Sequence, residues 1–208
     1  MRYPPPVLGL VAALALLAPG RATAQPREPV RGFVGDVRLL STTLPNGPGW
    51  TPALAADALV PGRGFGIEAG AHGLVGRGRH RRLGLGLSGL VAQGRATGVD
   101  SAPTVTTRFM AAAPHVSMNF GHAQGWSYLS GGVGMAKVTS AEAGGPADPG
   151  AWATAFHYGG GARWFLNEHV ALSLDLRFWA LTPRPANDTR PSSPATTRIA
   201  FGGGLAFR

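Results

Sequence analysis

The sequence predicts an all-β fold, an eight-stranded antiparallel up-and-down β-barrel that crosses a membrane. Three observations lead to this prediction. Segments of the chain alternate apolar with small or polar residues, the connections between them alternate long and short, and charge is scarce. Only 14% of the residues are charged, against roughly 25% in an ordinary domain, while 44% are hydrophobic. A chain of this composition exposes unusually little charge to its surroundings.

The N-terminus has the three regions of a secretory signal peptide. Arg2 supplies a positive start, residues 7–18 carry no charge, and Ala22-Thr23-Ala24 is a small-x-small cleavage site. We therefore expect residues 1–24 to be removed and residues 25–208 to form one exported domain. The uncharged run is shorter than the roughly 20 residues of a transmembrane helix, so any membrane crossing should use strands.

Eight segments show the period-2 pattern of strands that have two different faces. The clearest runs from Val170 to Phe178, where every even position is apolar and the odd positions include Ser173, Asp175 and Arg177. Each segment is long enough to cross a bilayer, which takes roughly 9 to 11 strand residues. In chain order the predicted strands are 31–43, 64–76, 82–93, 105–120, 126–138, 153–166, 169–181 and 197–208.

The connections between these segments alternate long and short. This alternation predicts a barrel with both chain ends on one side of the membrane, tight turns at that side and long loops at the other. The long connections contain turn formers such as Pro45-Asn46-Gly47. In order, the connections are 44–63, 77–81, 94–104, 121–125, 139–152, 167–168 and 182–196.

We expect odd positions to face lipid in the first three strands and the last, and even positions in the fourth to seventh. This assignment puts one aromatic girdle at the short-turn rim and a second nearer the long loops. The first girdle comprises Phe33, Phe120, Trp164 and Phe207, and the second comprises Phe65, Phe156 and Phe178.

The opposite parity predicts a polar interior in which acids pair with arginines. Eight strands leave room for little besides side chains, so we expect packed ion pairs rather than an open channel. The predicted interior network comprises Asp36, Arg38, Glu68, Arg163, Asp175, Arg177 and Arg198. Three inward histidines, His72, His115 and His157, lack a short metal-ligand spacing, and no cofactor motif is present, so neither a metal nor a cofactor is expected.

Several segments resemble the small outer-membrane barrel domains of the OmpA-like group. Residues 158–178 look like the sixth and seventh strands of that family, and residues 113–121 and 128–134 look like its central strands. The last strand, with an apolar face ending at Phe207, resembles the family's terminal insertion signal. The resemblance implies a bacterial outer-membrane location, with membrane lipid and the barrel-assembly machinery as partners. Because the chain ends at Arg208, we expect none of the peptidoglycan-binding domain that some relatives carry.

We expect a non-enzymatic protein with a structural role or an interaction role carried by its long loops, in which Trp50 is available to an extracellular partner. Nucleic acid is not an expected partner, because the arginines are scattered and the chain is exported. One alternative is a secreted soluble β-barrel that binds a small apolar ligand. Another is a lipid A-modifying hydrolase, since His115-Val116-Ser117 is similar to the His-x-Ser of outer-membrane lipid A deacylases. The family's acid partner is missing at the matching distance, and both side chains are predicted to face inward.

Overall fold

The computed structural model describes residues 32–208 except 48, 52–53, 55–57, 76–80, 99–102, 123, 187 and 189. The expected signal peptide lies outside the described residues. Among those described, no helix is long and apolar enough to cross a membrane. The strands are β1 (Phe33–Thr43), β2 (Arg63–Val75), β3 (Arg81–Ala96), β4 (Val105–His122), β5 (Gly125–Glu142), β6 (Trp152–Phe165), β7 (Val170–Leu181) and β8 (Thr196–Phe207).

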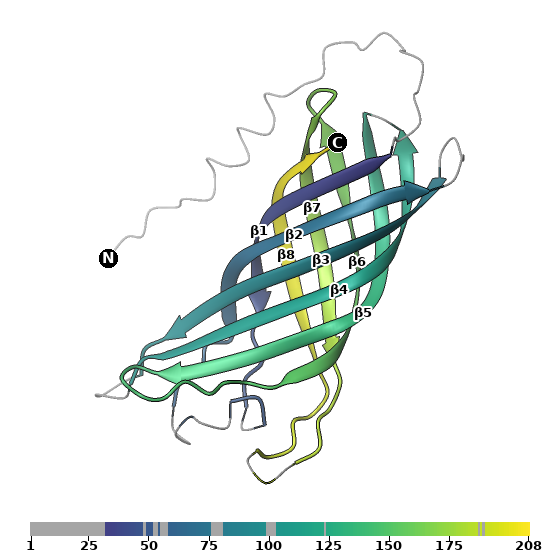
Figure 1. Ribbon diagram of the computed structural model, residues 1–208. Coiled ribbons are helices and arrows are strands. Elements are labelled where there is room, and N and C mark those ends of the chain that lie inside the picture. Colours follow the sequence, from purple (N-terminus) through teal and green to yellow (C-terminus); the bar gives the residue numbers. More distant parts are fainter. Residues whose placement is uncertain are drawn as a thin grey trace, which may run out of the picture.

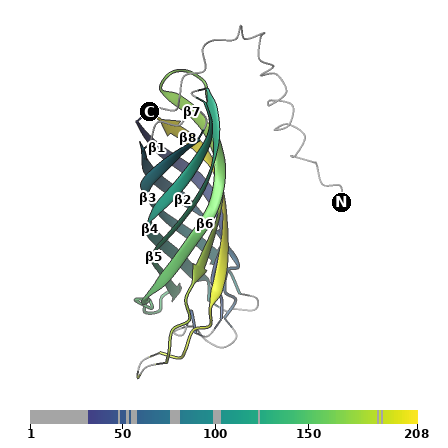
Figure 2. The same cartoon turned by 90° about the vertical axis from the view of Figure 1, so that its right-hand side faces the viewer.

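The eight strands form a closed barrel in which each strand pairs antiparallel with the next and β8 pairs with β1 (Figures 1 and 2). This architecture confirms the predicted fold class. The strand ends that the short connections join lie at the same end of the barrel as the C-terminus, and those that the long connections join lie at the opposite end (Figure 1). Strands β3, β4 and β5 are longer than predicted, with β4 and β5 at 18 residues each.

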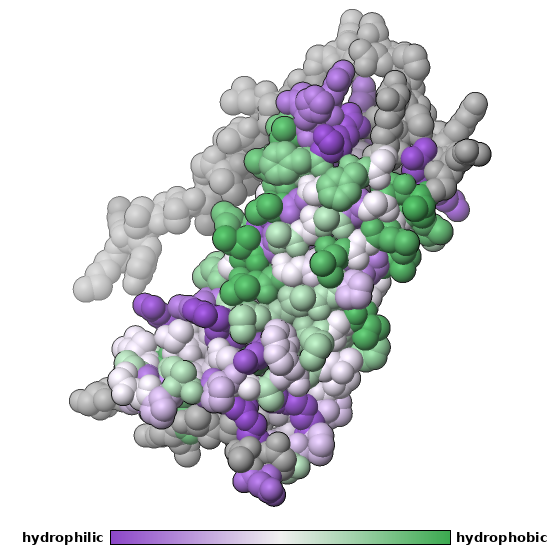
Figure 3. Space-filling model, in the orientation of Figure 1, coloured by the Kyte–Doolittle hydropathy of each residue, from purple (hydrophilic) through white to green (hydrophobic). Residues whose placement is uncertain are grey.

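The outer wall of the barrel is apolar. Large hydrophobic side chains point outward, with Phe65 73% and Leu39 70% exposed. They form a hydrophobic band across the middle of the wall, with hydrophilic side chains towards both ends (Figure 3). A water-soluble barrel would turn this face inward, so the soluble alternative is wrong and the band requires a hydrocarbon environment.

The predicted parity is wrong for β5. Trp126 and Tyr128 are buried, while Leu129 and Met135 are exposed, so odd positions face outward in this strand. The reason is the register. Residues paired across an antiparallel ladder share a face, and His122 pairs with Gly125, so the even outward positions of β4 lie beside odd positions of β5.

The seven aromatic residues of the predicted girdles all lie on the outer face. Phe33, Phe120, Trp164 and Phe207 lie at the short-turn ends of their strands. Phe65, Phe156 and Phe178 lie nearer the long loops. Five of the seven are exposed, whereas Phe120 and Phe178 are half-buried.

Candidate functional site

The inward side chains line the barrel in successive layers. Because alternate residues of each strand point into the lumen, one strand contributes to every layer. In β1, Val34 lies near the short turns, Asp36 and Arg38 lie further along, and Leu40 lies nearest the long loops. The candidate functional features are therefore the central polar layers and the loop-side mouth.

A central ion cluster lies across the lumen, between β1, β2, β6 and β7. It contains three acids and three arginines, and every member has at most 3% of its surface exposed. Balanced charge matters here, because an unpaired charge buried in this way is costly. The cluster comprises Asp36, Arg38, Glu68, Arg163, Asp175 and Arg177.

Arg38 bridges the three acids of the central ion cluster. Its Nη2 lies 2.5 Å from Asp36 Oδ1 and 3.3 Å from Glu68 Oε1, and its Nη1 lies 3.0 Å from Asp175 Oδ2. Arg177 joins two of the same acids, with Nη1 2.9 Å from Glu68 Oε1 and Nε 2.9 Å from Asp175 Oδ1. Arg163 donates to Asp36 Oδ2 at 2.7 Å. Each acid therefore contacts two arginines.

Tyr128 of β5 completes the central ion cluster. Its hydroxyl accepts a hydrogen bond from Arg38 Nη1 at 2.7 Å and donates one to Asp175. The Arg163 guanidinium lies 4.2 Å from the centre of its ring. The sequence did not predict this inward position, because even residues of β5 were expected to face outward. Gly161, opposite Tyr128 on β6, leaves the space that the hydroxyl needs, since a Cβ there would lie 2.7 Å from it.

Arg198, predicted to belong to the same network, lies apart from it. Its guanidinium donates to the carbonyl of Leu44 at 2.8 Å, and within the described residues no ion pair joins it to Asp175. The ladder explains the separation. On β8, Asp175 is opposite Gly202, whereas Arg198 is opposite Trp179. Four residues of strand correspond to about 13 Å.

The three inward histidines form a chain that leads from the ion cluster to the loop-side core, and at its first end His72 Nε2 lies 3.4 Å from Asp36 Oδ2. His115 Nε2 and His72 Nδ1 are 3.0 Å apart and share a hydrogen bond. The rings of His115 and His157 meet edge to face at 5.4 Å, and His157 lies 4.9 Å from Trp179. In the part of the chain that the structure describes, no group of three metal-ligating side chains is arranged to hold an ion.

The His-x-Ser motif does not form a nucleophile and base. His115 makes its hydrogen bond to His72, and the Ser117 hydroxyl accepts one from Asn119 Nδ2 at 3.0 Å. Both side chains are buried in the lumen. A lipid-cleaving site has to meet lipid, so this geometry gives no support to the hydrolase alternative.

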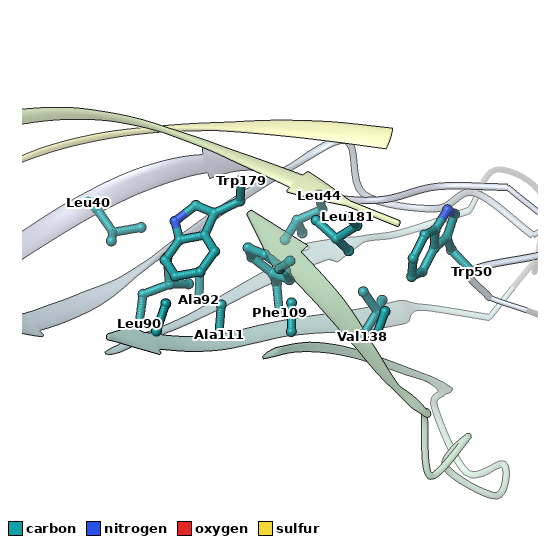
Figure 4. Close-up of a cluster of buried hydrophobic side chains, with 14 residues drawn as sticks. Leu40, Leu44, Trp50, Leu90, Ala92, Phe109, Ala111, Val138, Trp179 and Leu181 are labelled. Atoms are coloured by element: carbon teal, nitrogen blue, oxygen red, sulfur yellow. The ribbon is translucent and has the colours of Figure 1, made fainter. Parts of the chain in front are cut away.

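An apolar layer fills the loop-side half of the lumen (Figure 4). Trp179 of β7 lies across this layer with Phe109 and Leu90 beneath it, and Trp50 from the long loop at 44–62 lies at the outer end (Figure 4). Trp50 is only 2% exposed. The expectation that Trp50 would be available to partners is therefore wrong. An indole beside Leu44, Val138 and Leu181 is a core residue that loop sequence alone does not reveal.

Three long loops are tied together above this layer by Arg184. Its guanidinium stacks 4.6 Å from the Trp50 ring and donates to the carbonyls of Ala151 at 2.9 Å and Gly49 at 3.4 Å. Trp50 Nε1 in turn donates to Pro194 O at 3.2 Å, and Arg190 forms a salt bridge with Asp148. Partial burial and the neighbouring Arg190 cation lower the pKa of Arg184 from its ordinary value. The loops form a folded cap over the mouth.

Trp50→Ala is expected to open this cap. The substitution removes the ring that joins Arg184 to the apolar layer, and truncating a buried tryptophan typically costs about 3–5 kcal/mol. Proteinase K, which cuts accessible chain with little sequence preference, should then cleave the 182–195 connection at least several times faster in the variant, with the strands still protected. Leu59→Ala, on the same loop but exposed, is the control. Equal cleavage rates in both variants would contradict the role of Trp50 as a lid.

The comparisons with known proteins agree with this architecture. No protein-family model matches the chain, and no curated protein matches it either. Among solved structures, Neisserial surface protein A superposes with a TM-score of 0.54 at 11% identity, covering 85% of this chain and 97% of that one. The attachment invasion locus protein Ail of Yersinia pestis, in complex with the heparin analogue sucrose octasulfate, gives 0.52 at 9% identity, covering 86% and 99%.

The chain has the fold of a small bacterial outer-membrane β-barrel. Together with the apolar outer wall, this fold puts the chain in the outer membrane, as the sequence predicted. The resemblance to the OmpA-like group is confirmed at the level of the fold. Sequence identities of 9–11% support a shared fold but not a shared function. The function therefore has to be argued from the interior and the loops of this barrel.

Proposed function

We propose that this outer-membrane barrel is a closed, non-enzymatic membrane protein whose role is structural or is carried by contacts of its long-loop cap. The observation that supports the proposal is the set of buried side chains that lie across the lumen. The central ion cluster and the three histidines that adjoin it lie across the lumen, the apolar layer lies on their loop side, and Trp50 covers that layer. A solute would have to displace paired charges and a packed core in succession.

The cap supports an interaction role at the external surface. Arg184, Arg190 and Asp148 bind the loops to one another, so the loops present one preorganised surface rather than three independent flexible segments. A preorganised surface binds a partner at a lower entropic cost than loops that have to be ordered on contact. The partners we expect besides membrane lipid and the assembly machinery therefore meet the cap.

Conductance across planar bilayers tests the closed lumen. Purified barrel inserted at defined copy number is expected to give no resolvable open-channel steps, because paired charges and packed apolar side chains lie across the lumen. A variant with Trp50, Phe109 and Trp179 replaced by Ala, with its fold checked by heat-dependent gel mobility, serves as the opened control. Steady conductance of the unmodified protein, at a level comparable to the control, would refute the proposal.

A further inference from the structure

Four cations stand on the outer wall of the barrel, just beyond the hydrophobic band on the side of the long loops. Arg63 begins β2, Arg95 lies near the end of β3, Arg108 lies near the start of β4, and Lys137 lies in the loop-side half of β5. The three arginines are exposed and the lysine is half-buried. We call these four residues the cationic face.

The cationic face is a continuous row, because its members come from four adjacent strands. Arg108 is opposite Gln93, and its Nη2 donates to Gln93 Oε1 at 3.3 Å. Arg95 is the next outward residue after Gln93 on β3, and Lys137 is opposite Met110, the next outward residue after Arg108. Strands lie about 4.8 Å apart, so the row spans about 15 Å of wall.

No outward acid balances this row in the described loop-side ends of β2 to β5. The outward residues there are apolar, polar and uncharged, or basic. Glu142 at the end of β5 is opposite Val105, which is fully buried, so it lies on the inner side of the wall. Asp148 is engaged by Arg190 in the cap. Several like charges on one surface without an acid between them favour an anionic partner.

The row is confined to one half of the barrel. At the loop-side ends of β6, β7, β8 and β1, the described outward residues carry no charge. They are Trp152, Thr154, Ala180, Thr197, Ser41 and Thr43. A general adaptation to a polar interface would be spread around the whole wall. The asymmetry instead points to a defined ligand on one side.

The depth of the row identifies that ligand. Arg63, Arg108 and Lys137 each lie one outward position beyond an apolar side chain of the band, namely Phe65, Met110 and Met135. One outward step is two residues, or about 7 Å along a strand. A bilayer of about 40–45 Å with a hydrocarbon core of about 30 Å leaves roughly 5–8 Å for each headgroup layer. These three cations therefore lie at headgroup depth in the leaflet that faces the long loops, and Arg95, one outward position beyond Gln93, lies at the loop-side edge of the same layer.

We propose that the cationic face binds the phosphate groups of a phosphorylated glycolipid in the outer leaflet, seating that lipid against β2 to β5. Guanidinium groups suit this ligand, because their planar donors match phosphate oxygens in pairs. Lys137 lies 5.7 Å from the ring of Trp152 and bounds the row towards β6. The proposal rests on the outer-membrane location of the barrel and is independent of the closed lumen.

The test is a titration of the folded barrel in detergent micelles with bisphosphorylated lipid A, compared with the same lipid after dephosphorylation. The unmodified protein should prefer the phosphorylated form by about tenfold or more. Arg95→Gln should weaken binding of the phosphorylated lipid about threefold or more. Arg81→Gln, which removes an exposed cation from the short-turn end of the same strand, should leave it unchanged. Replacing all four residues of the cationic face by Gln should abolish the preference.

Two results would overturn the proposal. One is an equal loss for Arg95→Gln and Arg81→Gln, which would mean that net charge alone attracts the lipid. The other is binding of a soluble heparin analogue at the cationic face without any preference for phosphorylated lipid, which would assign the face to an external polyanion. Heat-dependent gel mobility reports whether each variant is folded. The two single variants decide the question even if the fourfold variant does not fold.

Discussion

Arg177→Met is expected to lower the free energy of unfolding by about 3–5 kcal/mol, the range found when one partner of a buried ion pair is removed. Arg177 is fully buried, and it contacts Glu68 and Asp175 at 2.9 Å each. Methionine keeps most of the side-chain length while leaving both carboxylates with Arg38 as their remaining cation. Urea titration of the barrel in lipid vesicles, followed by heat-dependent gel mobility, measures the loss.

A double-mutant cycle measures the coupling energy between Asp175 and Arg177. It thereby distinguishes a specific ion pair from the general effect of removing a charge from the interior. Asp175→Asn combined with Arg177→Met should cost less than the sum of the two single substitutions, because the pair that each one breaks is the same. Arg198→Met is the matched control, because Arg198 donates a hydrogen bond to the Leu44 carbonyl and lies outside the ion cluster. Its effect should simply add to that of Asp175→Asn. Coupling to Asp175 that is stronger for Arg198 than for Arg177 would contradict the observed pairing.

The strands and their order could be predicted from the sequence, because both depend on local patterns. Alternation such as that from Val170 to Phe178 gives a strand with one apolar face, and the spacing of the turns gives the up-and-down order. Which acid meets which arginine depends on register and on the shape of the lumen. Arg198 and Asp175 lie on neighbouring strands, yet the β7–β8 ladder separates them by four residues.

Two further features of the interior could be seen only in the structure. The inward orientation of Tyr128 follows from the His122–Gly125 pair at the β4–β5 turn, and an error of one residue there reverses the whole strand. Trp50 lies in a loop, where no alternating pattern of residues indicates which side chains point inward. Its burial depends on Arg184 and Pro194, which lie more than a hundred residues further along the chain.

The second large effect concerns the outer wall. Leu174→Arg is expected to destabilise the inserted barrel by about 2–4 kcal/mol, the cost of an arginine that faces lipid near the middle of the bilayer. Leu174 lies between Leu172 and Leu176 on the outer face of β7, with 44% of its surface exposed. Its ladder partners are Ala162 and Gly203, which offer the cation neither a counter-charge nor a hydrogen-bonding side chain.

Thr197→Arg provides the matched control for Leu174→Arg. This substitution introduces the same side chain on the neighbouring strand, β8, at an exposed outward position on the loop side of Ile199. Near the interface the cost of an arginine falls to about 0–1 kcal/mol, so folding into vesicles should be nearly unchanged. The difference between the two losses of folding free energy therefore reports how deep each position lies in the bilayer. A general sensitivity of the outer wall to arginine would give equal losses. Equal losses at Leu174 and Thr197 would show that the hydrophobic band is not the surface that meets the hydrocarbon core.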